Sequence, residues 1–537
     1  MGISSKIRLK RFKVKEDSDL QLVIQSQNGK SHKFHIDGLS LHGLSVTNDS
    51  KTSLKMQDGE LASCSKIVGN ELEIPLGRIV MRHNSSNHLM GFSCVDAKIP
   101  IDGVLSKFID AIEINPHEVE LNPNKFTLKE FLAEQSVEKD ILGKCRQFGI
   151  MLREWEKQPQ FQYRTVRERS RGTRINISSQ NRPVVVMGSN DYLGLADHPK
   201  VMEAAKKAID VYGVGSTGSP LTTGLTTLHE ELCDFLASFL KKEKVILFNS
   251  GYNANLGAIQ GLSKDNDLLV ADFLSHASIQ DGMKLASSSV RYFKHNSLEH
   301  LESILRTKRH QFAGCTIITE GIFSMDGDLP RLKEIIDIAK RYDARVYLDE
   351  AHSLGVIGKA GEGTASHLKL SKQVDVLMGT FSKCFGSIGG FVAADRDVCD
   401  WLYMFARSHM FSVALPPTVV AAVLAAGQII KEEPERIMQL KSNIRYFIRG
   451  LQDLGAPVSE HHESSVIPLI IGSEEKMGIM NQYLIENGVF VVPIVFPAVQ
   501  RNACRFRFTV MATHSQSQLD FVLHVLKNAM EKAGHRF

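Results

Sequence analysis

Hydrophobic and polar residues alternate in two different ways along the chain. In residues 1 to about 115, short alternating segments are separated by Gly, Asn, Asp and Ser, and they are Leu20–Gln25, Lys33–Ile36, Leu44–Thr47, Glu71–Ile74 and Leu89–Cys94. Alternation with a period of two between turn residues is typical of antiparallel strands. The pattern predicts a small all-β domain, a barrel or a sandwich, over residues 1–115.

After Asn122 the apolar residues recur at helical spacing as far as Trp155. Such spacing indicates amphipathic helix. The stretch from Glu156 to Arg182 is polar and basic, which predicts an extended arm or linker. Residues 116–182 are therefore expected to form a helical segment and a linker.

From Val184 onward, short apolar runs alternate with helical stretches such as Leu228–Leu240 and Leu329–Arg341. The predicted strands are Val245–Phe248, Leu268–Ala271, Ser289–Phe293, Thr316–Thr319, Arg345–Leu348 and Val374–Met378. This alternation predicts an α/β domain with a mainly parallel central sheet over residues 183–425. Ligands of such sheets bind beyond the carboxyl ends of the strands.

A smaller α+β domain is predicted over residues 426–537. Leu415-Pro416-Pro417 interrupts the preceding pattern, and a long helix follows from Thr418 to about Lys431. The strands expected after it are Val466–Ile471, Val489–Val492 and Arg505–Val510.

The composition is that of an ordinary globular protein. Of 537 residues, 43% are hydrophobic and 23% charged, and the net charge of +4 gives no argument for nucleic acid. No apolar run reaches the ~18 residues that a membrane helix needs, and the N-terminus has no secretory pattern. The eight cysteines form no CxxC pair, which favours reduced thiols in a cytoplasmic protein over disulfides or a metal site. A peripheral membrane contact stays open.

A lysine follows the predicted strand Val374–Met378, in the string Gly379-Thr380-Phe381-Ser382-Lys383. A lysine amine forms Schiff bases when burial or cationic neighbours lower its pKa. The hydroxyls of Thr380 and Ser382 could hold a phosphate beside it. A surface lysine in a glycine-rich turn is the alternative, and this string alone favours neither.

Asp349 ends another predicted strand, and His352 follows three residues later. A buried carboxylate at a strand end can pair with the protonated ring nitrogen of a pyridine cofactor and make it an electron sink. A solvated aspartate next to a structural histidine is the simpler interpretation. The string Asp349–His352 also occurs in helicases, but the chain has no GxxxxGK[ST] loop, which excludes that class.

Two more segments follow predicted strands. The first, Phe248–Asn255, contains Ser250, Gly251 and Tyr252. It combines a strand, a glycine turn and a helix start, which presents free N–H groups to a phosphate. The second contains His276, whose ring could stack on a flat cofactor. Each segment alone is a weak signal, because a lone histidine is more often structural.

In chain order these segments resemble fold-type I pyridoxal 5'-phosphate (PLP) enzymes, and among them the α-oxoamine synthases. The resemblance covers about residues 126–537 and rests on Ser189–Leu195, His276–Ile279, Phe323–Asp328, Asp349–His352, Thr380–Lys383 and Phe411–Pro417. It implies a fold-type I PLP transferase fold, PLP as the cofactor, and a homodimer that builds its active sites across the subunit interface.

The resemblance also implies a role for each matching residue. Lys383 holds PLP as a Schiff base and later moves protons at the substrate α-carbon, Asp349 pairs with the pyridinium nitrogen, and His276 stacks on the ring. The remaining residues contact the cofactor or the substrate: His352 and Ser324 at the ring hydroxyl, Ser250, Gly251, Tyr252, Thr380 and Ser382 at the phosphate, Ser412 at the phosphate of the neighbouring subunit, and Arg507 with Asn190 at the amino-acid carboxylate. Arg505 is the less favoured partner of that carboxylate.

The reaction implied is the condensation of an amino acid with an acyl thioester, either acyl-CoA or an acyl carrier, with release of CO2 and the thiol. The strings around His295, His352 and Lys383 resemble bacterial serine palmitoyltransferases most, which favours serine and a long acyl chain. Glycine and alanine stay open. Pro220 stands where the family usually has arginine, and proline supplies neither charge nor donor, so the acyl donor stays open as well.

The N-terminal segment resembles a PilZ domain, a barrel that binds cyclic di-GMP. The resemblance rests on Arg8–Arg11, Ile36–Leu44 and Met90–Phe92, and arginine forks suit phosphates and guanine edges. However, the arginines follow RxxR spacing instead of RxxxR, and Gly38 occupies the position of an aspartate. A barrel that binds no nucleotide is the alternative.

Two other functions remain at this point. One is a cyclic di-GMP-responsive binding protein with a vestigial enzyme domain, against which the complete set of cofactor residues argues. The other is a PLP aminotransferase, which keto-acid-dependent amino transfer would identify.

Overall fold

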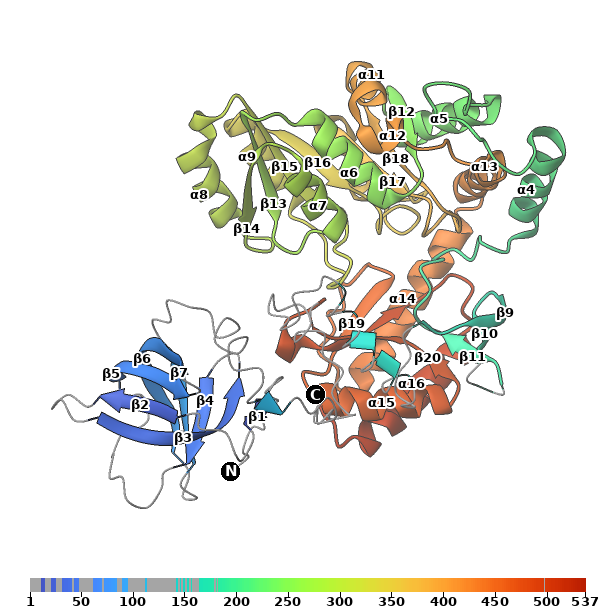
Figure 1. The fold of residues 1–537 in the computed structure, drawn as a ribbon. Coiled ribbons are helices and arrows are strands. Elements are labelled where there is room, and N and C mark those ends of the chain that lie inside the picture. Colours follow the sequence, from blue (N-terminus) through green and yellow to red (C-terminus); the bar gives the residue numbers. More distant parts are fainter. Residues whose placement is uncertain are drawn as a thin grey trace. The chain divides into compact units, whose positions relative to one another are not determined.

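The computed structural model describes eight strands between residues 11 and 113, a few residues between 142 and 156, and residues 164–537 except 178, 179, 181 and 497. The chain divides into two compact units, residues 1–158 and 159–537 (Figure 1). Arg8 and most of the helix predicted between residues 122 and 155 lie outside the described residues. The boundaries predicted at 115, 182 and 425 stay predictions.

The first unit contains an antiparallel sheet of eight strands: β1 (Arg11–Val14), β2 (Gln21–Gln25), β3 (Ser31–Ser40), β4 (Gly43–Thr47), β5 (Leu61–Gly69), β6 (Leu72–Asn84), β7 (Leu89–Cys94) and β8 (Ile112–Glu113). Their order is β2-β5-β6-β7-β4-β3-β1-β8, and β2 also pairs with β3. This additional pairing closes the strands from β2 to β3 into a ring, which is the barrel-like pairing that the alternating sequence predicts. The resemblance to PilZ and the binding of cyclic di-GMP stay predictions.

A mixed sheet of seven strands forms the centre of the second unit, in the order β12-β18-β17-β16-β15-β13-β14. Its strands are β12 (Lys244–Phe248), β13 (Asp267–Asp272), β14 (Ser289–Phe293), β15 (Gly314–Glu320), β16 (Arg345–Asp349), β17 (Val376–Thr380) and β18 (Gly390–Ala394). β18 is antiparallel to both neighbours and the other pairs are parallel. The mainly parallel sheet is therefore confirmed. β18 was not predicted, because Gly389 and Gly390 indicate a loop.

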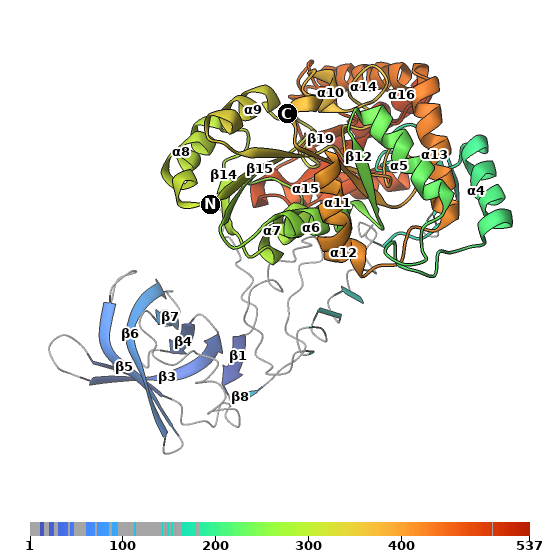
Figure 2. The same cartoon turned by 90° about the horizontal axis from the view of Figure 1, so that it is seen from above.

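The helices that precede, connect or follow these strands are α4 (Pro199–Tyr212), α5 (Thr227–Leu240), α6 (Gly251–Leu262), α7 (Ala277–Leu285), α8 (Leu298–Lys308), α9 (Leu332–Arg341), α10 (Thr364–His367), α11 (Arg396–Phe405), α12 (Arg407–Met410) and α13 (Pro417–Glu432). α6, α7 and α11 lie together (Figure 2), where Ala254, Ile279 and Leu402 join one buried core with the sheet. α6 begins just after β12 and α7 just after β13, so both helix N-termini lie at the carboxyl ends of strands.

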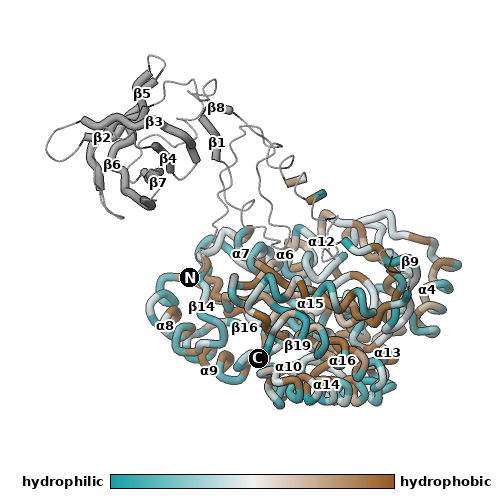
Figure 3. The backbone as a smooth tube through the Cα atoms, turned by 90° about the horizontal axis from the view of Figure 1, so that it is seen from below, coloured by the Kyte–Doolittle hydropathy of each residue, from teal (hydrophilic) through white to brown (hydrophobic). Residues whose placement is uncertain are grey.

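The C-terminal part contains α14 (Glu435–Asp453), α15 (Glu474–Glu486), α16 (Gln516–Lys532) and a sheet of β19 (Val466–Ile470), β22 (Arg505–Thr509) and β21 (Val492–Ile494). Hydrophobic and hydrophilic positions alternate along the helices (Figure 3), as expected where one face is buried. β22 is buried along its whole length, including Arg505 and Arg507.

The stretch predicted as an extended arm contains a β-hairpin. β9 (Arg167–Arg171) pairs with β10 (Arg174–Ile177), and β11 (Val184–Val186) joins β10 to β20 (Val489–Phe490). Ile175 and Ile177 are buried, an alternation that the many arginines obscure in the sequence.

Among the described residues, no helix combines the length and hydropathy that a membrane span requires. In the same part of the chain, no group of three or more His, Cys, Asp or Glu side chains is placed to hold a metal ion.

Candidate active site

Lys383 lies three residues beyond the end of β17, a strand that is buried throughout. Its side chain is half-buried. Burial lowers the pKa of the Lys383 amine to about 8, although the Asp349 carboxylate opposes this shift. An amine with a lowered pKa is more often in the nucleophilic, uncharged form near neutral pH.

Asp349 ends β16, the strand next to β17, and is 4% exposed. One carboxylate oxygen accepts a hydrogen bond from the backbone N–H of Ala351 at 2.8 Å, and the other accepts from Nδ2 of Asn255 at 2.7 Å. Asn255 is itself fixed, because its Oδ1 accepts from the Tyr347 hydroxyl at 2.8 Å. Asn255 lies in a predicted motif, but its role as the support of Asp349 was missed.

His276 precedes the first residue of α7, with its imidazole exposed. Its Nδ1 accepts from the backbone N–H of Ser278 at 3.2 Å, and its own backbone N–H donates to the carboxyl of Glu320. Glu320 ends β15 and lies directly opposite Asp349 in the parallel register. Burial raises the pKa of Glu320 well above its usual value, with Asp349 adding to the effect. Glu320 was not predicted as a site residue, because it belongs to none of the sequence motifs.

The start of α6 meets the end of β17. The Ser250 hydroxyl caps α6 by accepting from the N–H of Asn253 at 3.0 Å. A Cβ on Gly251 would lie 2.8 Å from Thr380 Oγ1, and Thr380 Oγ1 lies 2.9 Å from the Ser382 hydroxyl. A helix N-terminus beside two hydroxyls is a favourable place for a phosphate. Only glycine allows so close an approach of the two segments.

The side chain of Tyr252, the second residue of α6, points toward α7. It is partly exposed, and its hydroxyl donates to Asp281. Its ring centroid is 6.3 Å from that of His276.

Arg507 on β22 donates hydrogen bonds to two other predicted site residues, Ser324 and Asn190. Its Nε donates to the Ser324 carbonyl at 2.8 Å, and its Nη1 to Asn190 Oδ1 at 3.4 Å. Arg505, two residues earlier, forms an ion pair with Asp326 at 2.7 Å. Arg505 is therefore already neutralised, while Arg507 has only neutral hydrogen-bond partners among the described residues.

His352 is buried, and its Nδ1 lies 2.6 Å from the hydroxyl of Tyr192. Burial lowers the pKa of His352 well below its usual value, and Lys383 and Arg507 add to the effect, so the imidazole is neutral. Tyr192 belongs to the predicted Ser189–Leu195 motif, but its contact with His352 was missed.

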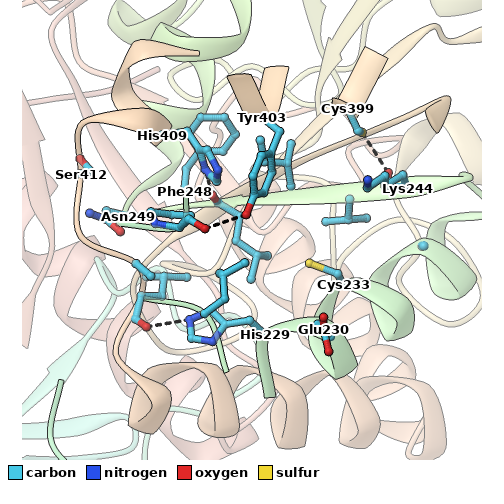
Figure 4. Close-up of a pocket in the computed structure, with 18 of the residues that line it drawn as sticks. His229, Glu230, Cys233, Lys244, Phe248, Asn249, Cys399, Tyr403, His409 and Ser412 are labelled. Atoms are coloured by element: carbon cyan, nitrogen blue, oxygen red, sulfur yellow. Dashed lines mark hydrogen bonds between the residues drawn. The ribbon is translucent and has the colours of Figure 1, made fainter. Parts of the chain in front are cut away.

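Ser412 lies between α12 and α13 along the chain. It lines a cavity of ≈480 Å³ together with His409 and Tyr403 (Figure 4). Among the described residues, none of the others predicted to hold PLP lines this cavity. Its predicted contact with a neighbouring subunit stays a prediction.

Together these groups fit a flat cofactor with a carbonyl, a basic ring nitrogen and a phosphate. The buried Asp349 carboxylate matches the nitrogen, the Lys383 amine matches the carbonyl, and the start of α6 matches the phosphate.

Comparison with known proteins shows to which family the second unit belongs. A family model described as aminotransferase class I and II matches residues 182–526. The chain belongs to this family.

Among the class I and II aminotransferases, its relatives include α-oxoamine synthases. An 8-amino-7-oxononanoate synthase of Treponema denticola is 40% identical over 353 residues, 66% of this chain and 89% of that protein. A serine palmitoyltransferase of Bacteriovorax stolpii is 39% identical over 369 residues, 69% of this chain and 87% of that protein.

Solved structures of this family agree. A structure of SPT with the PLP internal aldimine has a TM-score of 0.70 at 30% identity, and the match covers 74% of this chain and all (100%) of that one. A Sphingomonas wittichii serine palmitoyltransferase has a TM-score of 0.70 at 31% identity over 74% of this chain and 99% of that one. The predicted family, the fold-type I PLP transferase fold and PLP as the cofactor are thereby confirmed.

Two buried glutamates of the site give a testable contrast. Glu350 accepts from the N–H groups of Thr364 and Ala365 and from the Ser353 hydroxyl, whereas Glu320 has one donor, His276 N–H, among the described residues. Glu350→Gln places an amide NH2 against at least one of these donors, and we expect it to lower the free energy of unfolding by about 2–3 kcal/mol. Glu320→Gln replaces a neutral carboxyl group by a neutral amide, and we expect it to lower the free energy of unfolding by less than about 1 kcal/mol. Urea unfolding of both variants measures this difference.

The pH dependence of the same experiment has a defined sign. Because the folded-state pKa of Glu320 is raised, the wild-type protein loses stability as pH rises from the ordinary carboxyl pKa toward the raised one. Glu320→Gln removes that loss, so its stability relative to wild type increases with pH. Equal pH slopes for both proteins would show that folding does not raise the pKa of Glu320.

Proposed function

We propose that the chain catalyses the condensation of an amino acid with an acyl thioester, releasing CO2 and CoA or a carrier thiol to give an α-oxoamine. The observation that carries this proposal is the convergence of Lys383, Asp349 and Arg507 in a chain whose relatives are α-oxoamine synthases. PLP, when bound, supplies an electron sink for the carbanion formed at the substrate α-carbon.

The residues around the cofactor have distinct proposed roles. Lys383 holds the cofactor and moves the proton at the α-carbon, and Asp349 keeps the ring nitrogen charged. His276, whose exposed ring follows β13, stacks on the cofactor and orients the thioester. The start of α6 and the end of β17 bind the phosphate through Ser250, Gly251, Tyr252, Thr380 and Ser382, while His352 and Ser324 contact the ring hydroxyl.

Arg507 binds the carboxylate of the amino acid, with Asn190 beside it. Support comes from the contrast with Arg505, which is neutralised by Asp326. A buried arginine without a carboxylate partner is suited to bind one bidentately. This contact holds the amino acid in place before CO2 leaves.

Serine is the amino acid that we favour, with a long-chain acyl thioester as the donor. Serine palmitoyltransferases are among the relatives and the solved structures that match, but so are 8-amino-7-oxononanoate synthases. Glycine and alanine are therefore the competing substrates. The only polar group of Pro220 is its carbonyl, which accepts from the Tyr403 hydroxyl at 2.7 Å. Pro220 therefore gives no contact that would select acyl-CoA over an acyl carrier, and both stay open as the acyl donor.

The test is a matrix of amino acids against acyl thioesters, scored by the thiol released and by the product mass. Rapid turnover with serine and palmitoyl-CoA is the expected result. Release only with glycine or alanine would reject serine, and amino transfer to a keto acid without thiol release would reject the condensation itself.

The enzyme is further proposed to be a cytoplasmic homodimer with shared active sites, to which Ser412 contributes across the interface. Mixing a Lys383→Ala chain with a Ser412→Ala chain tests this, because a shared site regains one intact copy in the mixed dimer. Sites confined to single chains would show no recovery. Co-sedimentation with lipid vesicles tests a peripheral membrane contact.

A further inference from the structure

His295, just beyond the end of β14, links two carboxylates. Its Nδ1 lies 3.0 Å from Asp272 Oδ1 and its Nε2 lies 2.9 Å from Asp328 Oδ2. Both acceptors are carboxylates, so both ring nitrogens must donate, which requires the imidazolium form. Burial disfavours that form, but the hydrogen bonds that the ring donates to Asp272 and Asp328 outweigh it and raise the pKa of His295 to about 10.

Asp328 belongs to a tight turn, residues 323–328. The turn is closed by hydrogen bonds from Phe323 N–H to the Asp328 carbonyl at 3.0 Å and from Gly327 N–H to the Phe323 carbonyl at 2.8 Å. The His295 ring also packs edge-on against Phe323, with 4.5 Å between ring centroids. Asn296 adds a bond to Asp328 at 2.8 Å. His295 and Asn296 thus hold the turn from the β14 side.

The same turn also accepts hydrogen bonds from the arginines of β22. The Ser324 carbonyl accepts from Arg507 Nε at 2.8 Å, and Asp326 accepts from Arg505 Nη1 at 2.7 Å. Because Nε is fixed by a backbone carbonyl, the direction of the Arg507 guanidinium depends on where the turn lies. A displacement of about 1 Å in a positioning group can cost orders of magnitude in rate.

We propose that His295 is a positioning residue for the amino-acid carboxylate: its imidazolium fixes the 323–328 turn, and the turn orients Arg507 through the Ser324 carbonyl. The inference rests on the proposed role of Arg507. The charged groups that face His295 are Asp272 from β13 and Asp328 from the turn, and the turn also forms the Arg505–Asp326 ion pair. In this proposal His295 acts only through the turn.

The test uses the full-length, PLP-loaded enzyme and His295→Gln. Amino-acid binding is measured without acyl donor, from the change in cofactor absorbance on titration with serine, glycine and alanine separately. The dissociation constant and the KM of the amino acid are expected to rise about tenfold, with PLP content and the KM of the acyl thioester unchanged. A general loss of structure would lower PLP content and raise both KM values.

A double-mutant cycle with Arg507→Ala tests whether His295 acts through Arg507. If it does, His295→Gln weakens binding less than about threefold once Arg507 is absent. Full additivity of the two effects would overturn the proposed route. His300→Gln is the matched control, because the His300 imidazole contacts no carboxylate in the described part of the chain and only accepts from the backbone N–H of Lys294, and the change is expected to leave binding unchanged.

The outcomes separate the inference from the function on which it rests. Unchanged binding in Arg507→Ala would reject Arg507 as the carboxylate site. Weakened binding in Arg507→Ala with unchanged binding in His295→Gln would reject only the role of His295. If His295→Gln does not retain PLP, Asp328→Asn carries the same expectation, since it keeps the imidazole and removes the charge that the turn contributes.

Discussion

Lys383→Ala is expected to lower turnover at least about a thousandfold, because one amine both holds the cofactor and moves the proton at the substrate α-carbon. Its half-buried position beyond β17 and its lowered pKa suit both tasks. After borohydride reduction, mass spectrometry should find a cofactor adduct on the peptide containing Lys383 in the wild type and none in the variant. The visible absorbance of covalently bound cofactor should disappear with it.

Lys242 provides the matched control for this prediction. Burial lowers its pKa as well, but its amine donates to the Val374 carbonyl, before the start of β17. A lowered pKa is therefore not sufficient to make a lysine bind PLP, and we expect its position at the carboxyl ends of the strands to determine which lysine does. Lys242→Gln is expected to keep the cofactor adduct and turnover within about threefold. An adduct that persists in Lys383→Ala would reject the assignment of Lys383.

The positions of the main site residues follow from the sequence because each comes just after a strand. Asp349 ends β16, His276 follows β13 and Lys383 follows β17. Neighbouring parallel strands bring such ends to one edge of the sheet, so the short apolar runs in the sequence are sufficient to group these residues. Only the combination of motifs identified these residues as a PLP site, because each motif taken alone could equally be structural.

The supporting contacts could not be predicted in the same way. Asn255 reaches Asp349 across 94 positions of sequence, and Tyr192 reaches His352 across 160. Glu320 lies opposite Asp349 only because β15 and β16 pair in one particular register. These contacts depend on side-chain directions after folding, for which hydrophobic periodicity carries no information.

Two elements show the limits of the periodic pattern itself. β18 is fully buried between β12 and β17, so it has no polar alternation, and the glycines before it suggest a loop. The β9–β10 hairpin has the opposite problem, because its arginines hide the alternation of Ile175 and Ile177. In both cases tertiary packing determines the strand, and local preference does not.

Asp349→Asn is expected to lower turnover about a hundredfold or more while the protein keeps its fold and its PLP. The change keeps the shape of the side chain but removes the charge that favours a protonated ring nitrogen, and preorganised charge of this kind contributes about 10²–10³ in rate. Steady-state turnover measures the loss, and the reduced-adduct assay shows that PLP is still bound to Lys383.

The contacts of Asp349 make this variant a test of charge. The Ala351 N–H and Asn255 Nδ2 both donate to the wild-type carboxylate, and the amide oxygen of asparagine can still accept from one of them. Asp281→Asn is the matched control, because Asp281 is a partly exposed carboxylate of α7 that accepts from the Tyr252 hydroxyl, and turnover of this variant should stay within about threefold. If Asp349→Asn also stayed within threefold, the ring nitrogen would need no carboxylate, and the electron-sink chemistry proposed for this site would have to depend on another group.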